Sequence, residues 1–238
     1  MTATPPFDQI DACVFDAYGT LFDVHSAVAQ CRSMFANPDA EADKVSEIWR
    51  MKQLSYSWLR SLMGPKHHVE FWTVTGEALD FALESVLGAA APGPAGLRDA
   101  LLDSYLTLNI YSEVLGTLRT LKAGGKKLAI LSNGSREMLN RAADNSGISD
   151  LMDAILSVED VGIFKPDPRV YQLAVDRLGV TSDRISFQSS NAWDASAASA
   201  FGFRVAWINR FGQAKERIPG APDAELRRLD ELPPLLGL

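Results

Sequence analysis

Cysteine, long apolar runs and clusters of basic residues are all scarce in this chain of 238 residues. Its two cysteines, Cys13 and Cys31, are too few for a disulfide framework and indicate reduced or buried thiols. No apolar stretch approaches the length of a membrane span, and residues 1–10 lack the basic start and apolar run of a signal peptide. The net charge of −7, without any block of Lys or Arg, argues against nucleic acid or an anionic membrane as the main partner. We therefore expect a cytoplasmic protein.

The composition is that of a folded globular protein. Apolar residues make up 47% of the chain and charged residues 22%, so a sizeable core can form. The length suits one large domain, or a main domain that carries an inserted segment.

Short apolar runs alternate with helical patterns from Tyr111 onward. Strands are expected at 127–131, 154–156, 184–188 and 204–208, and the N-terminal run 12–15 is expected to be a further strand at the centre of the sheet. This alternation predicts an α/β fold with a parallel sheet and right-handed crossovers.

Residues 24–108 carry helical patterns instead. Helices are expected at about 24–36, 41–63, 77–87 and 97–108, with a linker at 89–94. We therefore expect an α/β core domain, formed by 1–23 and 109–238, and a helical insert formed by 24–108. The last thirty or so residues contain four prolines and little strand character, and no function is assigned to them.

Polar side chains able to carry chemistry follow several of the expected strands. They are Asp16, Ser132 with Asn133, Lys165, and a loop that ends at Asp194. Each has an ordinary interpretation, as a loop-start Asp, a helix cap, a solvated Lys or a first-turn acid. Because the carboxyl ends of parallel strands meet at the edge where such sheets bind ligands, four such loops together indicate a catalytic site.

These loops resemble the motif set of the haloacid dehalogenase superfamily and, more narrowly, of the L-2-haloacid dehalogenases. The matching segments are Phe15-Asp16-Ala17-Tyr18-Gly19-Thr20-Leu21-Phe22, Leu131-Ser132-Asn133-Gly134, Lys165-Pro166-Asp167, Ser189-Ser190-Asn191-Ala192-Trp193-Asp194, Ile48-Trp49-Arg50 and Gln53-Leu54-Ser55-Tyr56. The resemblance spans nearly the whole chain, and the segment 189–194 is its most specific part. It implies a Rossmann-like parallel sheet with an inserted helical cap.

Two positions distinguish this chain from the phosphatases that make up most of the superfamily. Those enzymes carry a second Asp two residues after the nucleophile, which protonates the leaving group, and an acidic pair in the last motif that holds Mg²⁺. Here the first position is Tyr18, and the last motif is acidic only at Asp194. A halide leaves as a stable anion without a general acid, and Mg²⁺ would lack anionic oxygen ligands. Carbon–halogen displacement is therefore favoured.

The resemblance implies that the protein converts short-chain (S)-2-haloalkanoic acids into (R)-2-hydroxy acids and halide, with no metal or cofactor. Asp16 would attack the carbon that bears the halogen and form an ester. Water, activated by Asp194 and Lys165, would then hydrolyse that ester. For Tyr171, packing on the core is nearly as good an interpretation as catalysis. The implied catalytic residues are Asp16, Thr20, Lys165, Tyr171, Ser189, Asn191 and Asp194.

The resemblance also implies how the substrate is held. Its carboxylate would bind a serine hydroxyl and backbone N–H groups, and the departing halide would bind a cap arginine, an amide and an indole edge in a dry pocket. The implied substrate-binding residues are Ala17, Tyr18, Arg50, Leu54, Ser132, Asn133 and Trp193, with Phe71 as a further candidate for the pocket wall.

Two other functions stay open. One is a Mg²⁺-dependent phosphatase or phosphonate hydrolase; the latter also needs a cap lysine that forms a Schiff base, for which Lys52 and Lys66 are the nearby candidates. The other is a non-catalytic binding protein, although the joint presence of Asp16, Lys165 and Asp194 argues against it.

Some side chains of the helical segment have more than one interpretation. Trp58 suits a homodimer interface or a buried position equally well. His67 and His68 suggest a metal site, but adjacent side chains point apart, which favours a solvated loop. For His25, at the start of the insert, a structural role is favoured over that of a general base.

Overall fold

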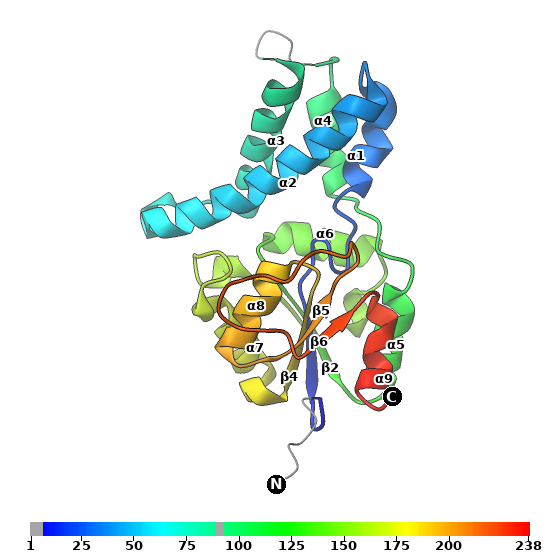
Figure 1. Ribbon diagram of the computed structural model, residues 1–238, viewed down its shortest axis with the longest axis vertical. Coiled ribbons are helices and arrows are strands. Elements are labelled where there is room, and N and C mark those ends of the chain that lie inside the picture. Colours follow the sequence, from blue (N-terminus) through cyan, green and yellow to red (C-terminus); the bar gives the residue numbers. More distant parts are fainter. Residues whose placement is uncertain (1–6, 89–92) are drawn as a thin grey trace.

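The computed structural model describes residues 7–88 and 93–238, and this part of the chain contains one sheet of six strands (Figure 1). Every neighbouring pair of strands is parallel, and all four residues of the central strand β1 are buried. The predicted α/β fold with a central first strand is therefore confirmed. In spatial order the strands are β3 (Ala154–Ser157), β2 (Lys127–Ser132), β1 (Ala12–Phe15), β4 (Ile185–Ser189), β5 (Arg204–Ile208) and β6 (Ala224–Leu226).

Helices cover the sheet, with α7 and α8 on one side and α5 and α9 on the other (Figure 1). Local signals set their ends. The Ser135 hydroxyl accepts the Met138 N–H at 3.3 Å at the start of α6. The Asp167 carboxylate and Pro168 begin α7, and Gly179, with φ of +62°, ends it. The helices are α5 (Val114–Ala123), α6 (Arg136–Asn145), α7 (Pro168–Leu178), α8 (Ala192–Phe201) and α9 (Leu232–Leu235).

The remaining α-helices lie together beyond the carboxyl ends of the strands (Figure 1). They are α1 (Ser26–Cys31), α2 (Pro38–Met63), α3 (Phe71–Leu87) and α4 (Leu97–Tyr105), and α2 and α3 pack against each other. We propose that residues 24–108 form a cap domain on a core formed by 1–23 and 109–238. The first four residues of the expected linker at 89–94 lie outside the described residues.

The cap helices differ in extent from those that the sequence predicts. The first is short, because a 3-10 turn (Arg32–Met34) follows it at once. Helix α2 begins three residues early, since Pro38 suits the first helical position, where no N–H bond is needed. Helix α3 begins at Phe71 rather than 77, and Phe71 and Val74 of its first turn are buried. The other 3-10 turns are Pro65–His67, Ser149–Leu151, Val158–Asp160, Ser182–Arg184 and Leu229–Glu231.

The C-terminal segment adds an element that its composition does not predict. Its three-residue strand β6 extends the sheet beside β5. Asp223 anchors this edge, because its N–H donates to the Val205 carbonyl and its carboxylate accepts the Val205 N–H, both at 2.8 Å. Such a short edge strand needs no apolar run, so the sequence gives little sign of it.

Along the described residues, no helix is long and apolar enough to cross a membrane.

Candidate active site

Asp16 lies at the carboxyl end of the central strand, where the sheet register brings the neighbouring strand ends beside it. Phe15 pairs with Ile130 of β2 and with Gln188 of β4, so Asp16 follows directly at the level of Ser189. The Asp16 N–H donates to the Gln188 carbonyl at 2.9 Å. Only 6% of Asp16 is exposed, although a carboxylate is rarely buried without partners.

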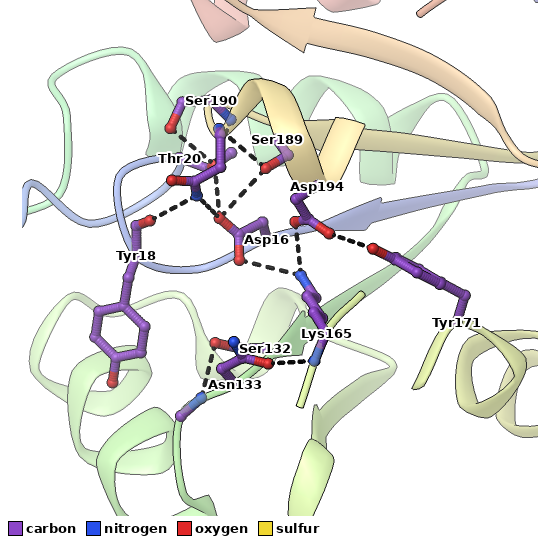
Figure 2. A network of polar contacts seen from close by, with 12 residues as sticks. Asp16, Tyr18, Thr20, Ser132, Asn133, Lys165, Tyr171, Ser189, Ser190 and Asp194 are labelled. Atoms are coloured by element: carbon purple, nitrogen blue, oxygen red, sulfur yellow. Dashed lines mark hydrogen bonds and ion pairs between the residues drawn. The ribbon is translucent and has the colours of Figure 1, made fainter. Parts of the chain in front are cut away.

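Lys165 is the principal partner of this carboxylate (Figure 2). Its ammonium lies 3.1 Å from Asp16 Oδ1 and 2.9 Å from Asp194 Oδ2, and its side chain is 1% exposed. Burial lowers the pKa of Lys165, but the two carboxylates outweigh burial and raise it overall. Lys165 therefore stays charged at neutral pH. Its backbone N–H donates to Asn133 Oδ1 at 2.9 Å, which ties this loop to the end of β2.

The second oxygen of the Asp16 carboxylate faces three donors. Asn191 Nδ2 lies 2.8 Å from Asp16 Oδ2, the Thr20 hydroxyl 3.2 Å and the Ser189 hydroxyl 3.5 Å. The Thr20 oxygen also accepts the Ser190 N–H at 2.8 Å, which directs its hydroxyl proton away from Ser190 N and toward the carboxylate. Ser190 is a supporting residue that the sequence prediction did not include.

Tyr171 belongs to the same network. Its hydroxyl donates to Asp194 Oδ1 at 2.7 Å, and both side chains are fully buried. Burial raises the pKa of the Asp194 carboxyl, an effect that the nearby Lys165 ammonium opposes. Burial also raises the pKa of the Tyr171 phenol well above its usual range, so this hydroxyl is a donor at neutral pH. The core-packing interpretation holds as well, since the ring contacts Phe187 and Phe203.

We expect Tyr171→Phe to slow, but not abolish, the hydrolysis of 2-haloacids that the sequence predicts. Asp194 would lose one of its two hydrogen-bond donors, which should lower the free energy of unfolding by about 1–3 kcal/mol and kcat by roughly tenfold. Steady-state kinetics and urea unfolding measure both. Tyr56→Phe, on a ring that packs on Phe81 in the cap, is the matched control and should leave kcat unchanged. Equal effects of the two substitutions would contradict a role for Tyr171.

Arg50 reaches the site from helix α2. Its guanidinium donates to Asn191 Oδ1 at 3.1 Å, to the Tyr18 carbonyl at 3.3 Å and to Gln53 Oε1 at 2.8 Å. Gln53 is fixed in turn by the Tyr105 hydroxyl, at 3.0 Å from its Nε2. Gln53 lies one turn after Arg50 on the same helix face, and this i, i+3 spacing could have identified it from the sequence.

Aromatic side chains from the cap helices and from the loops at the sheet edge lie close together. The Tyr18 ring stacks on Tyr105 at 5.5 Å and lies 6.2 Å from Phe71, the first residue of α3. Trp58 of α2 meets Trp193 of α8 edge to face, with their ring centroids 5.2 Å apart. This contact leaves Trp58 half-buried. Leu54 is half-buried on the same helix.

A cavity of about 670 Å³ opens beside Lys165. Trp58, Phe164 and Trp193 are among its mostly apolar walls. Asp16 and Asp194 do not line this cavity, and the Lys165 ammonium is buried between them, so the cavity lies beside the carboxylate network rather than on it.

The end of β2 and the loop formed by residues 17–22, which follows Asp16, supply donors for an anion. Ser132 is buried, and its hydroxyl accepts the Gly134 N–H at 3.1 Å. Among the described residues, the buried N–H groups of Ala17 and Tyr18 make no hydrogen bond with the protein. Buried N–H groups are nearly always paired, so these two are available to a ligand. A Cβ at Gly134 would lie 2.7 Å from the Tyr18 ring, so a larger residue there would displace that ring.

The histidines lie outside this network. His68 is half-buried with its ring 4.8 Å from Phe164, so the predicted solvated loop is wrong for this residue. The exposed His25 ring contacts the Ser46 hydroxyl at 2.8 Å. Within the described ranges, no group of three or more His, Cys, Asp or Glu residues is arranged to hold a metal ion.

A parallel α/β sheet that presents a buried Asp–Lys–Asp cluster at its carboxyl edge, beneath a helical cap, defines a class of hydrolases. Residues 10–202 match the family model of haloacid dehalogenase-like hydrolases, and the chain belongs to this family.

Individual relatives and solved structures are similar to this chain over nearly its whole length. The chain is 46% identical over 229 residues to (S)-2-haloacid dehalogenase 1 of Pseudomonas sp. (strain CBS-3), which covers 96% of this chain and 97% of that one. A crystal structure of a dehalogenase superposes with a TM-score of 0.90 at 44% identity, covering 96% of this chain and 98% of that one. L-2-haloacid dehalogenase of Xanthobacter autotrophicus, with chloropropionic acid covalently bound, superposes with a TM-score of 0.86 at 36% identity, covering 96% and 98%.

Proposed function

We propose that this protein is an (S)-2-haloacid dehalogenase. It hydrolyses short-chain (S)-2-haloalkanoic acids to (R)-2-hydroxy acids and halide, through an ester on Asp16. The contact of Asp16 and Asp194 with one buried lysine is the observation that carries this proposal. The names of the relatives support it, and the covalently bound chloropropionic acid in the Xanthobacter structure supports a covalent intermediate.

In the first step, a carboxylate oxygen of Asp16 displaces the halide from the 2-carbon from the back, so the configuration inverts. The donors on Asp16 Oδ2 hold the carboxylate in place while it attacks. The substrate carboxylate binds the Ser132 hydroxyl and the free N–H groups of Ala17 and Tyr18. Arg50, Asn133 and Trp193 hold the leaving halide in a dry pocket, where the attraction of Arg50 is stronger than in water.

In the second step, water attacks the ester carbonyl of Asp16 and releases the 2-hydroxy acid. Asp194 accepts a proton from this water, while Lys165 stays beside the Asp194 carboxylate and the Asp16 ester. Tyr171 keeps Asp194 oriented, and Thr20, Ser189 and Asn191 stabilise the Asp16 oxygens. The same network therefore serves both steps.

The phosphatase alternative fits the site less well. A phosphatase of this fold needs an acid where Tyr18 stands, and burial raises the pKa of the Tyr18 phenol well above its usual range. The two buried carboxylates already share the Lys165 ammonium, so a divalent cation would have to compete with a fixed positive charge.

Halide release should not depend on a divalent cation. We expect the protein to release chloride from (S)-2-chloropropionate in excess EDTA at the rate seen with added Mg²⁺, and to yield (R)-lactate. The (R)-enantiomer should react far more slowly, because the backside geometry is fixed. Chloride electrode readings and chiral chromatography of the product are the measurements. Release that requires Mg²⁺, or release of phosphate from a phosphate ester instead, would support the phosphatase.

Two further properties stay predictions. We expect a cytoplasmic location, in line with the free thiols of Cys13 and Cys31, both of which are buried. A homodimer is also open, and exposed Leu62 and Met63 at the end of α2 are where a contact would be sought.

A further inference from the structure

Arg210 contacts the loop formed by residues 17–22, which follows the proposed nucleophile Asp16. It lies two residues beyond the end of β5, and its guanidinium donates to the Thr20 carbonyl at 2.9 Å. Its side chain is 8% exposed. The Thr20 hydroxyl contacts Asp16, so one residue separates this buried cation from the nucleophile.

Two other contacts fix the guanidinium rigidly. It lies over the Tyr111 ring, with 3.8 Å from Cζ to the ring centroid, and it pairs with the buried Glu113 carboxylate. Burial raises the pKa of Glu113, but the hydrogen bonds and charge of Arg210, with backbone donors, lower it overall, so the pair is ionic at neutral pH. Glu113 directly precedes α5, so it is attached to a helix of the core.

The chain leaves the core for the cap at about residue 23 and returns at about residue 109, and these two segments are hydrogen-bonded to each other. The Tyr111 N–H donates to the Leu21 carbonyl at 3.1 Å, and the Asp23 N–H donates to the Asn109 carbonyl at 2.8 Å. The outgoing and returning segments are therefore paired side by side. Arg210 bonds the outgoing segment at Thr20 and stacks on the returning one at Tyr111.

We propose that Arg210 is a positioning residue for the nucleophile and acts through Thr20. The Thr20 hydroxyl can aim at Asp16 only while its backbone is held, and Arg210 supplies the side-chain donor to that backbone carbonyl. Without this donor, a buried carbonyl would lose its partner and the loop would relax. This assignment rests on the proposed dehalogenase function for its kinetic readout, but not for its structural one.

The first test uses two substitutions. Arg210→Met removes the guanidinium, whereas Arg210→Lys keeps the ion pair with Glu113 but cannot also make the forked contact with Thr20. We expect kcat for halide release to fall by roughly 10- to 100-fold in both, with KM changed less than about threefold, because displaced reacting groups lose rate rather than binding. Arg228→Met is the control, since Arg228 contacts Glu113 at 3.7 Å but lies on the surface. It should leave kcat unchanged.

A double-mutant cycle with Thr20→Ala separates positioning from general stabilisation. If Arg210 acts through the Thr20 hydroxyl, Arg210→Lys should add less than about threefold to the loss already caused by Thr20→Ala. Losses that multiply, or an Arg210→Lys variant with full kcat, would overturn the assignment.

Hydrogen exchange provides the readout that does not need turnover. Arg210→Lys should speed amide exchange in residues 17–22 by more than any change in global stability accounts for, and unchanged exchange there would contradict the assignment. A wild-type protein that releases no halide would instead contradict the proposed function, while leaving this exchange test decisive for Arg210.

Discussion

Asp16→Asn is expected to abolish halide release, with a loss of about 10⁴-fold or more in kcat, since the substitution removes the nucleophile itself. The amide is similar in size to the carboxylate, so the fold should persist, but a neutral amide cannot displace a halide. Chloride release from (S)-2-chloropropionate measures the loss, and circular dichroism checks the fold.

Asp11→Asn is the matched control for this substitution. Asp11 lies just before the same strand, and its carboxylate pairs with Arg184 at the surface. An exposed pair of this kind contributes little, so activity should stay within about twofold of the wild type. Substantial turnover by Asp16→Asn would mean that the reaction does not pass through this carboxylate.

Lys165→Met should damage both stability and activity. The Met side chain has nearly the same length, but it leaves two buried carboxylates without their shared cation. Removing one partner of a buried ion pair costs about 3–5 kcal/mol, which should appear as a lower free energy of unfolding in urea. We also expect kcat to fall by about 10³-fold, because Asp16 and Asp194 lose their common donor.

Lys122→Met provides the comparison for Lys165→Met. Lys122 contacts Asp153 at 2.7 Å, but both side chains are more than one-third exposed. Its loss should therefore cost less than about 1 kcal/mol. If Lys165→Met unfolds no more easily than Lys122→Met, the buried cation is not what holds the two carboxylates.

Much of the core could be predicted because a parallel sheet follows simple rules. The run 12–15 is apolar at every position, which is typical of a strand covered on both faces, and the structure places it at the centre. The next strands along the chain are separated by helices with clear apolar spacing. Element ends were harder to predict, because Pro38 and Phe71 extend helices beyond the periodic pattern on which the prediction relied.

The candidate site could be predicted in part for the same reason. Asp16, Lys165 and Asp194 each follow a strand, and parallel strands bring such positions to one edge. Spacing alone could not show that Lys165 lies between the two carboxylates, or that Thr20 is held by Ser190. Those contacts depend on loop conformations that carry no periodic signal.

Residues outside the motifs were missed for a different reason. Arg210 follows β5 as Asp16 follows β1, so the same rule could have found it. Gln53, by contrast, lies within one of the matching segments of α2, and its i, i+3 spacing from Arg50 was the signal that could have found it. Strand β6 is too short to show a pattern at all.

The most direct measurement is the mass of the peptide that contains Asp16, taken from enzyme quenched with acid during turnover of (S)-2-chloropropionate. Ester formation on this carboxylate predicts a fraction of the peptide heavier by one propionate unit, with fragment ions that locate the added mass on Asp16. In Asp16→Asn the heavier peptide should be absent. A wild-type peptide of unchanged mass, sampled while chloride is being released, would contradict covalent catalysis by this residue.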